Sequence, residues 1–333
     1  MCISSLFSSV RWRMFRRWRY KLAGVSLLAF ATFCVTVLVD VHHKMHYSSP
    51  DLTVNVLPPA IEPHLGKEEF SLLAIITSRP QSQSTRRTIR QTWGSLHGAG
   101  TTWKMIFNLG KTFDPQRDLQ LENESTLHRD LFIGNYKDTY ENLILKVFTV
   151  FTWAIGVKCK FVLKADDDVY VHVPRLINWL QSPGTPSRIY AGFLAEDTGV
   201  ERIPWKRHFV SYKTYPRSRY HTYCRGPYYV MSHNILSQLW NATKLFEPFA
   251  IEDAYVGLVI VSMGITPMQV TGCSWKDTNS MYKLQHKDEC FFKTGVCVGD
   301  QLGENAIQLA HQRFVAADQN AALQEKCLDI NKL

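Results

Sequence analysis

Residues 161–171 read Phe-Val-Leu-Lys-Ala-Asp-Asp-Asp-Val-Tyr-Val, an apolar run that reaches three consecutive carboxylates and is followed by a second apolar run. The first run predicts a buried strand. The triplet then lies at a strand end, where open α/β sheets bind ligands. Two carboxylates at i and i+2, such as Asp166 and Asp168, can offer oxygen ligands to one divalent cation whose open positions accept substrate phosphates. The alternative is a solvated turn.

Strands and helices alternate around this triplet. We predict strands at residues 70–77, 103–109 and 161–165, a helix at residues 84–93 that ends at Gly94, and a long amphipathic helix from residue 136 to about residue 155. Such alternation is typical of a mostly parallel sheet with ligands at the carboxyl ends of its strands. Residues 77–80, Thr-Ser-Arg-Pro, offer no glycine loop for phosphates. The sequence therefore predicts a nucleotide-binding α/β fold without a P-loop or a dinucleotide-binding motif.

The N-terminal part of the chain predicts a membrane anchor. Residues 1–21 form a basic tail with six Arg and Lys side chains, and residues 22–39 carry no charge. The uncharged stretch is just long enough to cross a bilayer, and its positive flank predicts a cytoplasmic N-terminus. A cleaved signal peptide is the alternative, but no small-x-small cleavage site follows. We predict a type II membrane protein with a stem at residues 40–67 and a lumenal α/β region at residues 68–333, which is long enough for one large domain or two fused lobes.

Charge and cysteines agree with a lumenal protein. Of the net charge of +9, the first 40 residues contribute +5, and the mildly basic remainder does not argue for nucleic acid. An even number of cysteines beyond the anchor suggests disulfides, whose pairing the sequence does not give. These are Cys159, Cys224, Cys273, Cys290, Cys297 and Cys327. Asn123 and Asn241 begin N-glycosylation sequons, which predict a glycoprotein.

Four segments together resemble one enzyme family. They are residues 86–94 (RRTIRQTWG), residues 138–146, residues 164–171 and residues 252–257 (EDAYVG). Their order and spacing resemble the β-1,3-galactosyltransferase family of inverting Golgi glycosyltransferases, which includes N-acetylglucosaminyl and N-acetylgalactosaminyl members. The resemblance implies a GT-A fold in a single lumenal domain, a UDP-sugar donor, Mn²⁺ and an acceptor glycan on a glycoprotein or glycolipid. It also implies a location in the Golgi membrane, with the catalytic domain in the lumen.

The resemblance assigns the donor and metal side of the site to two segments. Asp168 is the expected direct Mn²⁺ ligand, Asp166 is expected near the metal or the ribose, and Asp167 belongs to the same donor-binding region. Arg86 and Arg90 are expected to build the donor side, although a structural ion pair is an alternative for Arg90.

Further family positions are expected to pack, to form a salt bridge or to bind the metal. Trp93 is expected to pack rather than to contact the donor. Asp138 and Lys146 match the helix before the metal strand, where a structural salt bridge is an equal alternative. The third metal ligand is expected to be His311, with His286 as the alternative.

The resemblance places the catalytic base in residues 252–257. Asp253 is the expected base, because inversion needs one carboxylate that takes the proton of the acceptor hydroxyl from the face opposite the leaving group. Glu252 is the rival, since neighbours on a helix point about 100° apart and will not serve equally. Two acids that favour the macrodipole of a helix N-terminus are the structural alternative.

Two residues depart from the family pattern. In residues 223–230, Arg225 replaces a small residue and Tyr228 replaces a glycine, so Tyr228 could occupy a backbone conformation that glycine prefers. The leading hypothesis is a β-1,3-galactosyltransferase, and the rivals transfer N-acetylglucosamine or N-acetylgalactosamine. A catalytically silent relative that binds glycans or assists another transferase is the hypothesis from a different class.

Overall fold

The computed structural model describes residue 26 and residues 29–39, 56–97, 102–323 and 326–327. Within this described part, no helix is long and apolar enough to cross a membrane. Residues 29–39 are helical, but much of the predicted anchor, the whole basic tail and residues 40–55 of the stem lie outside the described residues. The anchor therefore stays a prediction.

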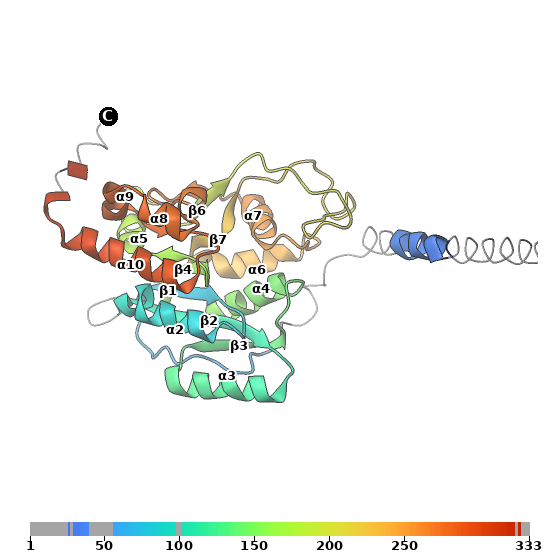
Figure 1. Cartoon of the computed structure of the whole chain (residues 1–333), viewed down its shortest axis with the longest axis horizontal. Coiled ribbons are helices and arrows are strands. Elements are labelled where there is room, and N and C mark those ends of the chain that lie inside the picture. The colour runs from blue at the N-terminus through green and yellow to red at the C-terminus, as the bar shows by residue number, and fades with distance from the viewer. Residues whose placement is uncertain (1–25, 27–28, 40–55, 98–101, 324–325, 328–333) are drawn as a thin grey trace, which may run out of the picture. The chain divides into compact units, whose positions relative to one another are not determined.

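A seven-stranded mixed sheet organises residues 56–200 and 217–327 (Figure 1). Its strands are β1 (Phe70–Thr77), β2 (Trp103–Lys111), β3 (Leu131–Lys137), β4 (Cys159–Asp166), β6 (Tyr190–Ala195), β7 (Tyr223–Ser232) and β8 (Met268–Gln269). They run in the order β3-β2-β1-β4-β7-β6-β8. The first four are parallel, and β7 is antiparallel to both β4 and β6. The sheet thus changes direction beside β4, the strand that ends at the Asp triplet.

Helices cover both faces of this sheet, and β1 is therefore buried along its whole length. On one face, Leu72, Ala74 and Ile76 share an apolar core with helices α2 (Gln83–Gln91), α5 (Val173–Leu180) and α10 (Glu304–Gln319). On the other face lie α4 (Leu143–Ala154), α6 (Leu236–Thr243) and α7 (Glu252–Ser262). The sheet pattern and the covering helices confirm the predicted α/β class.

The remaining elements are short or peripheral. They are η1 (Trp93–His97), α3 (Pro115–His128), β5 (Tyr170–Val171), η2 (His233–Ile235), η3 (Lys276–Thr278), α8 (Met281–Gln285), α9 (Glu289–Thr294) and β9 (Cys297–Val298). The predicted helix over residues 136–155 is wrong in its first turns. Tyr136 lies in strand β3, where it is buried against glycines of β2 and β3, and the helix begins only at Leu143.

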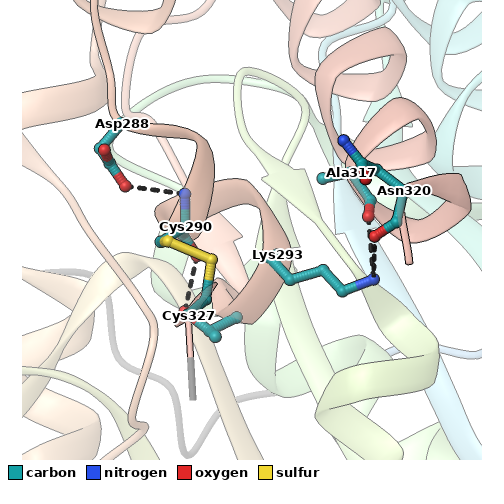
Figure 2. The surroundings of a disulfide bond; sticks show 7 residues. Asp288, Cys290, Lys293, Ala317, Asn320 and Cys327 are labelled. Carbon is teal, nitrogen blue, oxygen red and sulfur yellow. Dashed lines mark hydrogen bonds between the residues drawn. A yellow bond between two sulfur atoms is a disulfide. The ribbon is translucent and has the colours of Figure 1, made fainter. Parts of the chain in front are cut away.

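One disulfide, Cys290–Cys327, ties α9 to the C-terminal segment (Figure 2). In the same region, the side chain of Asp288 accepts from the backbone N–H of Cys290 at 2.7 Å, and Lys293 Nζ donates to the carbonyls of Ala317 and Asn320. Cys159, Cys224, Cys273 and Cys297 are free thiols in this structure. Of the six cysteines predicted to be lumenal, two form a disulfide and four do not.

Residues 201–216 form a separate compact loop. Within it, Arg202 donates to the carbonyls of Val210 and Tyr215, each at 2.7 Å, and stacks over the ring of Tyr212. Trp205 is 73% exposed.

Candidate functional site

Two of the three carboxylates of the triplet have a side-chain partner at the end of β4. Asp166 Oδ1 accepts from Lys164 Nζ at 2.6 Å. Asp167 donates its backbone N–H to the carbonyl of Thr77, at the end of β1, and its side chain accepts from the hydroxyl of Ser78 at 2.7 Å. The triplet therefore lies at the carboxyl edge of two parallel strands, as the sequence predicted.

Asp168 is the member of the triplet whose charge is least compensated. Its Oδ1 atom is buried and has no hydrogen-bond partner among the described residues. Burial, and then the negative charges of Asp166, Asp167 and Asp300, raise the pKa of Asp168 to about 7. A buried carboxylate with an orphaned oxygen, surrounded by like charges, fits a divalent cation with oxygen ligands.

Lys164 is a central residue of the site to which the sequence analysis gave no role. It is buried, and its Nζ lies 2.6 Å from Asp166 Oδ1, 2.6 Å from the carbonyl oxygen of Gly226 and 3.9 Å from Glu252 Oε2. Burial lowers the pKa of Lys164, but the carboxylates of Asp166 and Glu252 outweigh burial and keep this pKa above its ordinary value. One ammonium group thus links β4, β7 and α7. The position of Lys164, two residues before the triplet, was the only sequence feature that could have indicated this role.

Asp253 lies in the first turn of α7, on a different segment from the triplet. Its Oδ2 atom accepts from the backbone N–H of Gly226 at 2.7 Å, and its Oδ1 atom accepts from that of Ala254 at 2.9 Å. A Cβ atom at residue 226 would lie 3.3 Å from Oδ2, so glycine permits this close approach. Burial raises the pKa of Asp253, while the two backbone donors, Lys164 and Arg225 oppose this rise.

Glu252, the rival base, is directed into the interior. Its carboxyl group is buried, and the hydroxyl of Tyr229 donates to Oε1 at 2.6 Å. Burial raises the pKa of Glu252 to about 7, with Lys164 opposing this rise and Asp253 adding to it. Asp253 is only half-buried, so it is the acid of the pair that an acceptor can reach more easily.

Arg86 and Arg90 form a framework beneath the site. Arg86 is fully buried, and its Nε donates to Glu124 Oε1 at 2.9 Å. Arg90 pairs with the same Glu124 and with Asp130 at 2.9 and 2.8 Å. Arg86 also donates to Ser78, which in turn donates to Asp167. Arg86 thus supports the triplet through Ser78, and its role in donor binding stays a prediction, whereas Arg90 forms the structural ion pairs that were its alternative.

The other family positions of the first half are also structural. Trp93 is fully buried in the core, as expected for a packing residue. Lys146 Nζ lies 2.7 Å from Asp138 Oδ2 and donates to the carbonyl of Ser78 at 2.7 Å. Of the two roles that the sequence left open for Asp138 and Lys146, the structure contains the salt bridge.

The two histidines that were candidates for the third metal ligand each contact a tyrosine. His311 is on α10, with Nδ1 3.1 Å from the hydroxyl of Tyr170. His286 is exposed at the end of α8, where its Nδ1 contacts the carbonyl of Tyr282. Among the described residues, no three His, Cys, Asp or Glu side chains gather in a group that could hold a metal ion. The expected role of His311 as a third ligand therefore has no support from this arrangement.

The two departures from the family pattern differ in their surroundings. Tyr228 does not have a positive φ, is buried and donates its hydroxyl hydrogen to the carbonyl of Ser274 at 2.9 Å. Its bulk is thus accommodated in the core. Arg225 is half-buried, with its guanidinium carbon 4.1 Å from the centre of the Trp275 ring.

The chain is similar to known glycosyltransferases. The profile of the Galactosyltransferase family matches residues 84–271. The chain is 31% identical over 214 residues to lactosylceramide 1,3-N-acetyl-beta-D-glucosaminyltransferase of Xenopus tropicalis, which covers 60% of this chain and 56% of that protein. It is 32% identical to human beta-1,3-galactosyltransferase 5 over 58% of this chain and 64% of that protein. These matches thus span less than two thirds of either relative.

A third relative is covered more fully, and the solved structures are more distant. Mouse beta-1,3-galactosyltransferase 1 is 30% identical over 67% of this chain and 71% of that protein. The apo structure of the WbbM bifunctional glycosyltransferase aligns with a TM-score of 0.42 and 8% identity, over 80% of this chain and 53% of that one. Because the family profile covers more than half of its residues, the chain belongs to the galactosyltransferase family, among relatives that are β-1,3-glycosyltransferases.

Proposed function

We propose that this protein transfers a sugar from a UDP-sugar to the 3-hydroxyl of an acceptor glycan, with inversion at the anomeric carbon and with Mn²⁺. Family membership supports the transferase class. The observation that carries the mechanism is that Lys164 connects the metal side to the base side of the site. Lys164 binds Asp166 and the carbonyl of Gly226, whose N–H binds Asp253. Carboxylates from two segments thus flank one site, as a single displacement requires.

Asp253 is the proposed base. Its carboxylate takes the proton of the acceptor hydroxyl while the hydroxyl oxygen forms a bond to the anomeric carbon and the bond from that carbon to the diphosphate breaks, which releases UDP. The backbone donors from Gly226 and Ala254 hold the carboxylate in place. Partial burial raises its pKa, which makes Asp253 a stronger base than an exposed aspartate.

Asp166 and Asp168 are the residues that would hold Mn²⁺. A bound divalent cation supplies Lewis-acid stabilisation of the negative charge on a departing diphosphate. Asp168 contributes the orphaned oxygen, and Asp167 anchors the triplet to Ser78. We propose a GT-A type of fold for the mixed sheet that carries these residues.

Galactose is the proposed donor sugar, and N-acetylglucosamine and N-acetylgalactosamine are the rivals. The relatives' names include both a galactosyl- and an N-acetylglucosaminyltransferase. We further propose a Golgi membrane location with the catalytic part in the lumen, on the basis of the basic tail and the uncharged stretch at residues 22–39.

The test uses the full chain, expressed in eukaryotic cells and purified in detergent. It is incubated with Mn²⁺, each of the three UDP-sugars and a panel of acceptor glycosides, and UDP release and product linkage are measured. Release with one donor and a β-1,3-linked product would support the proposal. Binding of UDP and Mn²⁺ without product from any acceptor in a broad panel would instead favour the catalytically silent relative.

A further inference from the structure

Strand β7 opens to solvent at one short stretch beside the proposed base. Its first two and last five residues are buried, whereas residues 225–227 are partly accessible. The middle residue of this stretch, Gly226, donates its N–H to Asp253 at 2.7 Å. Arg225, the residue before Gly226, is thus partly accessible beside Asp253, and its positive charge acts on that carboxylate.

The guanidinium of Arg225 is held in place by an aromatic ring and has no ion-pair partner among the described residues. It stacks on the Trp275 ring with 4.1 Å between its central carbon and the ring centre. Its Nε atom is buried and has no hydrogen-bond partner within the described residues, and no carboxylate of that same part of the chain forms an ion pair with it. The two Nη groups have no hydrogen-bond partner among the described residues and, unlike Nε, are not buried, so they are the donors that a ligand can reach. A half-buried cation is costly unless a partner compensates its charge.

The stacking partner of Arg225 is itself fixed. Trp275 donates its indole N–H to Asp300 Oδ2 at 2.6 Å, which sets the plane of the ring. A guanidinium that lies on a fixed aromatic plane keeps its hydrogen-bonding edge free and pre-oriented. Carboxylates and sulfates match this edge, because Arg binds planar or tetrahedral oxyanions through two parallel N–H groups.

We propose that Arg225 is a specificity-determining residue that binds a carboxylate or a sulfate group on the acceptor sugar. This inference rests on the proposed transferase function and narrows its substrate to an anionic acceptor class. The acceptor is favoured over the donor diphosphate as the ligand of Arg225. Arg225 is next to Gly226, which binds Asp253, where the acceptor hydroxyl loses its proton. The diphosphate is instead expected near Asp168, whose orphaned oxygen marks the metal side of the site.

The experiment compares matched acceptors by binding, so that it does not depend on turnover. Full-length protein with UDP and Mn²⁺ is titrated with methyl β-glucoside against methyl β-glucuronide, and with methyl β-galactoside against its 6-sulfate. Dissociation constants are measured by calorimetry. A charge-assisted pair predicts that the wild type binds one charged member about ten- to a hundredfold more tightly than its neutral partner. The two pairs distinguish a carboxylate from a sulfate.

Three variants make the test specific. Arg225→Gln should bring the charged-to-neutral ratio to about one, and Arg225→Lys should keep part of the preference because it keeps the charge but loses the planar edge. Arg188→Gln removes an exposed arginine that contacts only Gln238 among the described side chains, and it should leave the ratio at the wild-type value. Melting temperatures identify any variant that fails to fold, in which case the wild-type ratio and Arg225→Lys decide.

Two results would overturn the inference. One is equal affinity of the wild type for the charged and neutral members of both pairs. The other is a loss of UDP affinity in Arg225→Gln with an unchanged acceptor ratio, which would assign Arg225 to the donor. Transfer is measured separately with the same glycosides. A wild-type preference for the anion without any transfer would defeat the proposed transferase function but not the anion site.

Discussion

Replacing Glu124 by glutamine should destabilise the protein strongly. Glu124 pairs with Arg86, which is fully buried, and with Arg90, so the substitution leaves a buried guanidinium without its counter-charge. Loss of one partner of a buried pair costs about 3–5 kcal/mol. For a domain of this size, each kcal/mol lowers the melting temperature by about 2–4 °C, so a fall of about 6–20 °C is expected.

The measurement is thermal unfolding followed by circular dichroism, together with UDP affinity. Glu122→Gln is the matched control, because Glu122 is exposed on the same helix α3 and should change the melting temperature by less than about 2 °C. Arg86 and Arg90 would be donor contacts rather than framework residues if Glu124→Gln melted like the control while UDP affinity fell. That result would show that Glu124 does not stabilise the protein through its pairs with the two arginines.

Three further predictions concern stability. Burial would raise the pKa of Glu124, but the hydrogen bonds and charge of Arg86, and then of Arg90, outweigh burial and hold this pKa below its ordinary 4.5. The ionised Glu124 therefore contributes fully to the free energy of unfolding above pH 4.5, and this contribution is lost as the pH falls below that value. Denaturant titrations from about pH 5 to 3 should show a steeper loss of stability in the wild type than in Glu124→Gln, and equal slopes would contradict this. Gly257→Ala would place a Cβ atom 2.2 Å from that of Tyr223, so α7 must shift from β7 at a cost of about 1–3 kcal/mol. Gly303→Ala, with nothing within 4 Å, is its control in the same urea titration, and equal midpoints would disprove the close contact. Cys290→Ser removes the disulfide and should cost about 2–5 kcal/mol under non-reducing conditions, and an unchanged melting temperature would count against the bond.

The local pattern was enough to predict the strands that carry the site. Continuous apolar runs predicted β1, β2 and β4, and the triplet was placed correctly at the end of β4 because a run of three aspartates cannot continue a buried strand. The sequence pattern failed at β3. Residues 136–142 were assigned to the helix, although the mostly polar stretch at residues 137–142 separates β3 from the apolar stripe of α4.

Side-chain roles were harder to predict than strands. The pairing of Arg86 with Glu124 joins residues 38 positions apart, and nothing in the spacing of either residue indicates it. Trp275 and Asp300 likewise meet only because distant loops fold together. Lys164 was within the quoted motif, and its contact with Asp166 is local, but its contact with the carbonyl of Gly226 depends on the antiparallel pairing of β4 with β7.

Tyr228 illustrates a different limit. A tyrosine at a family glycine position indicated a strained backbone or a blocked site, but the ring is buried in a regular strand and its hydroxyl is satisfied by Ser274. This removes one of the two observations that favoured a catalytically silent protein. The remaining one, Arg225, is better explained as part of the acceptor site.

Asp253 is the proposed base of an inverting transfer. The most direct measurement is the single-turnover rate of sugar transfer by the wild type, Asp253→Asn and Glu252→Gln, with UDP affinity measured on the same samples. Asp253→Asn should lose about 10²- to 10⁴-fold in rate while it keeps its affinity for UDP, and Glu252→Gln should lose less. A wild-type rate in Asp253→Asn, or a larger loss in Glu252→Gln at equal stability, would show that Asp253 is not the base.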